Sequence, residues 1–175
     1  MNDNKKRIRL VVYLGVLAAL YVVLTLPVAQ FAFGPIQFRL AEALTVLHIF
    51  AFGYIPGVSL GCFLANLLNP SNLGPVDIIG GTAAILIAGI LSRLIGKRNK
   101  FLGIIPPVLV NGLIVGGYLP FLLLDPGSEI TGAAVIVSML EIAVSEAFVM
   151  MIIGIPLMLI ITHTPALKAL IEKVD

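Results

Sequence analysis

The residues of this chain best suited to chemistry are ionisable and amide side chains set within apolar runs. Arg39 and Glu42 lie three positions apart, which would place them on one face if the segment is helical. Carboxylates accept hydrogen bonds, so a pocket that combines several of them with amides and one arginine favours a small polar ligand that is rich in N–H donors or positively charged. A guanine-like edge is one example, because its adjacent N–H donors can bond to a single carboxylate.

The sequence predicts a substrate-binding set and no catalytic residue. Glu146 is the leading acceptor, because it lies roughly 22 Å into the last apolar segment, where an ionisable group is costly without a partner. Glu141 is five positions earlier, about 140° around a helix, and is a weaker candidate. Gln37 and Asn69 are expected in the same outer half of the helical bundle as these residues. The predicted substrate-binding residues are Arg39, Glu42, Asn66, Asp77, Asn111, Tyr118, Glu141 and Glu146.

Each of these residues also has a structural alternative. Arg39 and Glu42 could form a local ion pair at the end of a short helix. Glu146 could bond to a neighbouring helix, and Asn66 and Asn111 could hold helices together. The spacing of the residues leaves these alternatives open.

Other classes of site find little support. Gly89 and Gly96 precede Lys97, but six residues lie between them, whereas a phosphate-binding loop has four residues between its glycines and Ser or Thr after the lysine. His48 and His163 are the only histidines and lie far apart in the sequence, so a metal centre or a histidine-based triad lacks partners. We therefore expect neither an enzyme nor a metal or cofactor.

The composition indicates that lipid is the main solvent of this chain. Hydrophobic residues make up 59% of its 175 residues and charged residues 11%, with a mean hydropathy of +1.11. Soluble domains usually carry about 25% charged residues. There is no tryptophan, so the tyrosines, among them Tyr21, remain as candidate anchors at the membrane interface.

The apolar runs predict a single all-α domain over 1–175, a bundle of about six transmembrane helices. The run that begins at Leu10 is too long for a typical signal peptide, so we interpret it as a retained helix. The second and third segments are short for spans and could form a re-entrant pair or pack within protein. We expect a kink at Pro156 and a polar tail over 168–175. The predicted helices cover about 10–29, 39–53, 55–69, 76–95, 101–124 and 132–161.

Basic residues orient this topology. With six spans, the N-terminus, the loop at 93–100 and the C-terminus lie on one side of the membrane, and ten of the eleven Lys and Arg residues fall there, Arg39 being the exception. Because basic residues favour the cytoplasmic side, both termini are predicted to be cytoplasmic.

Three runs resemble a known family. IQFRLAEALTVL (36–47), IPGVSLGCFLANLLN (55–69) and VDIIGGTAAILIAG (76–89) are similar to the queuosine-precursor transporter family, QueT, and SEAFVMMIIGIPL (145–157) also fits. The resemblance extends from about residue 8 to 160. It departs from the pattern at His48, where we expect proline, and at Ser145, where we expect glycine.

The resemblance implies a substrate-binding subunit, or S-component, of an energy-coupling factor transporter in the plasma membrane of a prokaryote. The implied partners are a transmembrane coupling protein and two cytoplasmic ATPases, and the cargo is a 7-deazaguanine such as 7-aminomethyl-7-deazaguanine or queuine. The family implies that small residues on the first helix meet the coupling protein, and the matching positions here are Gly15, Ala18 and Ala19. It also implies that a loop, here 31–38, covers the pocket.

Other functions remain open. The chain could be an S-component for another vitamin, or an ion-coupled secondary carrier, although we see no inverted repeat. A small membrane enzyme would need a catalytic cluster, and a purely structural subunit would not need the inward polar set.

Overall fold

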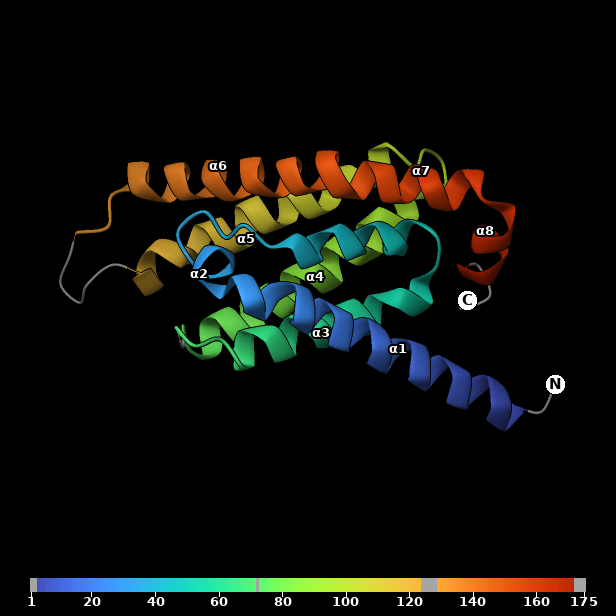
Figure 1. The fold of residues 1–175 in the computed structure, drawn as a ribbon. Helices are drawn as coiled ribbons and strands as arrows, with labels where there is room; N and C mark the ends of the chain where they lie inside the picture. The colour runs from blue at the N-terminus through green and yellow to red at the C-terminus, as the bar shows by residue number, and fades with distance from the viewer. Residues whose placement is uncertain (1–2, 72, 124–128, 172–175) are drawn as a thin grey trace.

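The computed structural model describes residues 3–71, 73–123 and 129–171. In these ranges every regular element is a helix, and together the helices form an elongated bundle (Figure 1). The elements in chain order are α1 (Asp3–Thr25), η1 (Leu26–Val28), α2 (Ala29–Ala32), η2 (Leu40–Ile49), η3 (Phe52–Tyr54), α3 (Ile55–Leu67), α4 (Pro75–Gly96), η4 (Leu102–Ile104), α5 (Ile105–Leu123), α6 (Gly132–Val149), η5 (Met150–Gly154), α7 (Ile155–His163) and α8 (Pro165–Ile171).

Four helical runs are long and apolar enough to cross a membrane. They are Leu10–Ala32, Pro75–Gly96, Leu102–Leu123 and Gly132–His163, and each matches a predicted span closely. Two shorter apolar helices, Leu40–Ile49 and Phe52–Leu67, correspond to the two short segments. The all-helical membrane fold is therefore confirmed, whereas a count of six spans stays a prediction.

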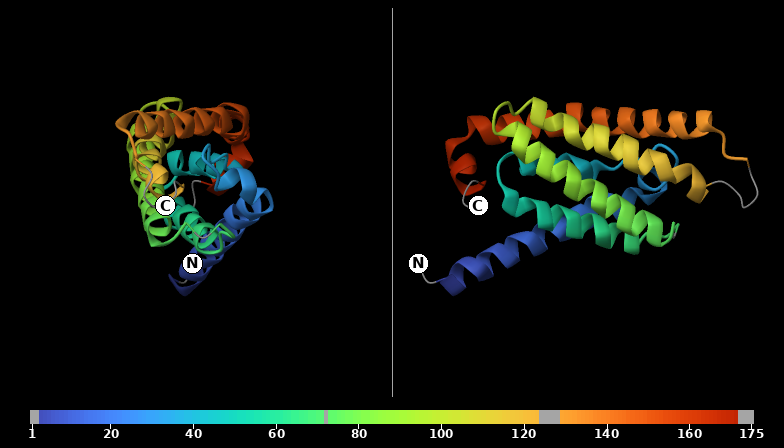
Figure 2. Two further views of the ribbon diagram at one scale, coloured as in Figure 1. Left: turned by 90° about the vertical axis from the view of Figure 1, so that its left-hand side faces the viewer. Right: turned by 180° about the vertical axis from the view of Figure 1, so that it is seen from behind.

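The short helix η2 lies at the centre of the bundle. It contacts α1, α3, α4, α6 and α7, and the end-on view shows it enclosed by these helices (Figure 2, left). Eight of its ten residues are buried. It is a 3₁₀ helix, with three residues per turn, so side chains three apart are stacked. Such an irregular helix is tolerated at membrane depth because protein, not lipid, surrounds it.

Glycines bring the outer helices into close contact. On α3, a Cβ at Gly61 would lie 2.5 Å from Cβ of Tyr21 on α1. Between α5 and α6, a Cβ at Gly116 would lie 2.5 Å from Cα of Met139. Small residues allow helices in a membrane to approach this closely, and dispersion contacts then stabilise the pair.

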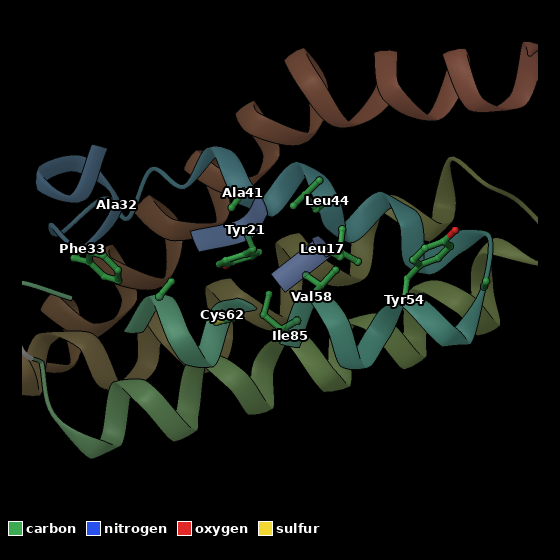
Figure 3. Close-up of a cluster of buried hydrophobic side chains, with 12 residues drawn as sticks. Leu17, Tyr21, Ala32, Phe33, Ala41, Leu44, Tyr54, Val58, Cys62 and Ile85 are labelled. Atoms are coloured by element: carbon green, nitrogen blue, oxygen red, sulfur yellow. The ribbon is translucent and has the colours of Figure 1, made fainter. Parts of the chain in front are cut away.

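The largest apolar cluster joins α1, η2, α3 and α4. Leu17, Tyr21, Val58, Cys62 and Ile85 pack together there (Figure 3). Tyr21 has no exposed surface, so our interpretation of this tyrosine as an interface anchor was wrong. It lies on the inner face of α1, and its hydroxyl points into the bundle.

Both ends of the described chain lie at the same end of the bundle, where α1 begins and α8 ends (Figure 1). The predicted polar tail is helical from Pro165 to Ile171, and its later residues, 172–175, lie outside the described ranges. The hydroxyl of Tyr54 donates a 3.0 Å hydrogen bond to the carbonyl oxygen of Ile171. Helix α8 is thereby held against the bundle. A π-helical stretch, the wide turn η5, separates α6 from α7 just before Pro156, and the kink expected at Pro156 stays a prediction.

Candidate functional site

A small polar pocket lies between η2, α4, α5 and α6, in the half of the bundle away from the described chain ends. Its volume is about 10 Å³, roughly the room for one water molecule. The lining residues are Gln37, Arg39, Glu42, Gly81, Asn111, Val115, Ile142 and Glu146. Four of the eight predicted site residues, Arg39, Glu42, Asn111 and Glu146, therefore line one pocket although they come from three separate segments.

Glu42 is the most strongly bonded carboxylate of the pocket. The Tyr21 hydroxyl on α1 donates to its Oε1 at 2.6 Å. The amide Nδ2 of Asn111 on α5 lies 3.5 Å from its Oε2, at the limit of a hydrogen bond. Glu42 is 3% exposed, so these donors replace the water that would otherwise solvate its charge. Tyr21 was not among the predicted site residues, since nothing in its local sequence marks it as facing inward.

Arg39 is turned toward α4. Its Nε donates to the carbonyl oxygen of Ala32 at 2.9 Å, and its guanidinium lies 4.9 Å from the ring centroid of Phe33. Its Nη2 is 4.0 Å from Oδ2 of Asp77. Within the described part of the chain, Asp77 is the carboxylate that lies within 4.0 Å of the Arg39 guanidinium. The alternative of a local ion pair between Arg39 and Glu42 was therefore wrong. Arg39 is extended, not helical, which directs its side chain away from Glu42.

Asp77 belongs to a layer directly behind the pocket. The Tyr118 hydroxyl donates to its Oδ1 at 2.9 Å, and Nδ2 of Asn66 donates to its backbone oxygen at 3.0 Å. Gly81 makes this arrangement possible, because a Cβ there would lie 2.7 Å from Nδ2 of Asn66. Asn66, Asp77 and Tyr118 therefore position Arg39 and are absent from the pocket lining.

Glu146 differs from Glu42 in having one carboxylate oxygen without a hydrogen-bond donor. It is 5% exposed, and its Oε1 has no hydrogen-bond partner among the described residues. Nε2 of Gln37, another residue of the pocket lining, is also buried and unpaired. A buried polar group without a partner is costly, more so when it is charged. The pocket lining thus presents one unfilled acceptor, Glu146 Oε1, and two unfilled donors, Gln37 Nε2 and Arg39 Nη2.

The charges of this region do not balance. Arg39, Glu42, Asp77 and Glu146 are each at most 5% exposed. If all were ionised, one positive charge would face three negative ones. Glu141, by contrast, is exposed and absent from the lining, so the structure gives no support to its place in the pocket.

The three small residues predicted to meet a partner do not share one environment. Gly15 and Ala19 are exposed, and a Cβ at Gly15 would meet nothing within 4 Å. Ala18 is 2% exposed and its Cα lies 3.1 Å from the position of a Cβ at Gly61. Ala18 therefore packs inside the bundle, and only Gly15 and Ala19 remain available to another protein.

Comparison with known proteins identifies a family and one curated relative that are similar to this chain. The model of a family described as QueT transporter matches residues 11–163. A curated relative from Lactococcus lactis subsp. cremoris (strain MG1363), named Queuosine precursor transporter QueT, is 36% identical over 92 residues, which is 51% of this chain and 53% of the relative. The matched region thus spans about half the length of that relative. No solved structure matches the chain.

Proposed function

The chain belongs to the QueT transporter family, and on this premise we propose that it is the substrate-binding subunit of an energy-coupling factor uptake system, which captures a queuosine precursor at the outer side of the membrane. It is a membrane transport protein and not an enzyme. The proposed cargo is a 7-deazaguanine such as 7-aminomethyl-7-deazaguanine or queuine. The name of the Lactococcus relative supports this cargo class.

The observation that carries the proposal is the buried acidic pocket. Two carboxylates and one guanidinium in its lining, and the carboxylate of Asp77 directly behind it, are nearly inaccessible to solvent. In a low-dielectric interior uncompensated negative charge is strongly disfavoured. A ligand with a cationic amine and several N–H donors would compensate this charge. The aminomethyl group and the guanine-like edge of a 7-deazaguanine supply both.

The unfilled hydrogen-bonding groups suggest how the ligand is oriented. Glu146 Oε1 is a free acceptor, suited to the adjacent N–H donors of the guanine-like edge. Gln37 Nε2 is a free donor, suited to the ring carbonyl. In this arrangement Glu42 and Arg39 are held in place by protein partners and shape the electrostatics of the site.

The pocket must enlarge before a ligand of this size enters, because about 10 Å³ admits only one water molecule. The segment 31–38 is the part we propose to move. The ring of Phe38 lies 6.1 Å from that of Phe148 on α6, a typical aromatic contact. Gln37 has a φ of 48°, a conformation uncommon outside glycine. Movement of this loop would separate the two rings and open the pocket.

The proposed partners are a transmembrane coupling protein and two cytoplasmic ATPases. The outward face of α1 supports this assignment, because Val11, Val16 and Val23 are each more than 60% exposed, next to Gly15 and Ala19. The first half of α1 stands away from the bundle (Figures 1 and 2). Such a face, lined with small and β-branched residues, permits close approach of another helix.

Calorimetry with the purified chain tests the cargo. We expect 7-aminomethyl-7-deazaguanine and queuine to bind, and guanine to bind more weakly because it lacks the cationic aminomethyl substituent. Riboflavin and thiamine should give no heat of binding. Binding of one of these vitamins, without binding of the deazaguanines, would instead assign the chain to another cargo and leave the fold and family unchanged.

A further inference from the structure

A second hollow lies on the lipid-facing surface, apart from the polar pocket. It has a volume of about 250 Å³ and lies between the start of α5 and the run from α6 to α7. Its floor is Ile104 and Met150, which are 7% and 1% exposed. Its walls are Phe101, Ile105 and Val108 on one side and Ala147, Met151 and Ile155 on the other. All of these side chains are apolar, so nothing in the lining could bond to a peptide backbone.

The groove follows from a change in the contact between α5 and α6. Toward the other end of the bundle, Gly112 and Gly116 let α5 touch α6 directly. In the groove, Ile105 and Val108 occupy the facing positions, and the wide turn η5 interrupts the partner helix. The larger side chains and the wide turn keep the helices from closing together, and a slot remains.

The ammonium group of Lys100 lies near the end of this slot. Met151, Ile155 and Thr162 are four and seven residues apart, so they lie on nearly the same face of the helical run. The ammonium of Lys100 donates to Oγ1 of Thr162 at 3.4 Å and lies 5.1 Å from the ring centroid of Phe50. Lys100 is thereby fixed beyond the end of the groove, toward the side where the described chain ends lie.

We propose that this groove is a binding site for an anionic glycerophospholipid, with an acyl chain in the slot and the phosphate on Lys100. Hydrocarbon is the natural occupant of a fully apolar slot on membrane-spanning helices, because a peptide would leave its polar groups unsatisfied there. A cation at the membrane surface attracts acidic headgroups. In the predicted orientation the lipid belongs to the cytoplasmic leaflet. This site is independent of the proposed cargo.

Native mass spectrometry of the purified chain, with phosphatidylglycerol or phosphatidylcholine carrying identical acyl chains, tests the headgroup. We expect tighter binding of phosphatidylglycerol. Lys100→Gln should lower that affinity about fivefold, as the attraction of one surface cation requires, while Lys100→Arg retains it. The control is Lys97→Gln, which removes an equal charge from a lysine that lies over Phe52 instead. Equal losses in the two glutamine variants would reduce the effect to general surface charge and overturn the proposal.

The slot is tested separately. Ala147→Trp fills the groove and should reduce binding of both lipids. Val137→Trp adds the same bulk to an exposed position of α6 that is ten residues away, about 15 Å, and should not. Size-exclusion profiles that match the parent establish that both variants are folded. If a folded Ala147→Trp variant retains phosphatidylglycerol as well as the parent does, no acyl chain occupies the groove.

Discussion

The hydroxyl of Tyr21 on α1 donates a 2.6 Å hydrogen bond to the carboxylate of Glu42 in the polar pocket. Tyr21 lies on the inner face of the helix whose outer face carries Gly15 and Ala19. Helix α1 therefore contacts the proposed ligand site with its inner face and carries the proposed partner surface on its outer face. A shift of α1 against the bundle would alter the donors around Glu42, which gives the two sites a direct physical connection.

The first prediction concerns this bond. Tyr21→Phe removes the donor and leaves buried Glu42 with only its long contact to Asn111. We expect a loss of about 1–3 kcal/mol in the free energy of unfolding, measured as a lower midpoint of thermal unfolding in detergent. Tyr13→Phe, on the same helix and half-buried, is the control. An unchanged midpoint in Tyr21→Phe would mean that the bond contributes nothing to stability.

The second prediction separates binding from stability at Glu146. Glu146→Gln removes a negative charge that has no donor on its Oε1. We expect binding of 7-aminomethyl-7-deazaguanine to weaken tenfold or more, about 1.4 kcal/mol or more. The ligand-free protein should be at least as stable as the parent, because a neutral amide is less costly to bury.

Glu129→Gln and Glu141→Gln serve as controls for this experiment, since both glutamates are exposed. Calorimetry should give them the affinity of the parent. If Glu146→Gln binds as tightly as the parent, Glu146 is a structural residue. If Glu141→Gln weakens binding instead, the ligand approaches from the exposed side of α6.

The third prediction contrasts two faces of α1. Gly15→Leu and Ala19→Leu add bulk to exposed positions and should abolish uptake into cells while ligand binding remains nearly intact. Ala18→Leu adds the same bulk where α1 meets Gly61, and should destabilise the chain by about 1–3 kcal/mol. Uptake assays, calorimetry and thermal unfolding distinguish these outcomes. A parallel loss of binding and uptake in Gly15→Leu would place that residue within the fold of the chain.

The fourth prediction is the orientation. Ser71 and Arg98 are both exposed and lie in different interhelical connections. In a Cys62→Ala background, a membrane-impermeant thiol reagent added to whole cells should label Ser71→Cys and leave Arg98→Cys unlabelled until the cells are opened. The opposite pattern would reverse the topology and place the acidic pocket on the cytoplasmic side.

The sequence by itself determined the class of this protein and the chemical type of its site. Apolar runs of a length that spans hydrocarbon leave little choice but a helical membrane fold, because every backbone polar group must be bonded within the chain. A carboxylate deep in such a run requires compensation wherever it points. The angular separation of Glu141 and Glu146 also anticipated that the two would face differently, and the former is exposed while the latter is buried.

Tertiary structure decided which partners these groups have. The spacing of Arg39 and Glu42 predicts a pair only if both are helical, but Arg39 precedes the helix, and Asp77, distant in sequence, is its partner. Tyr21 and Ala18 became interior residues because glycines on α3 draw α1 inward on that face. Local sequence sets helical periodicity and burial cost, whereas the contacts of a long-range pocket depend on how separate helices are packed and rotated against one another.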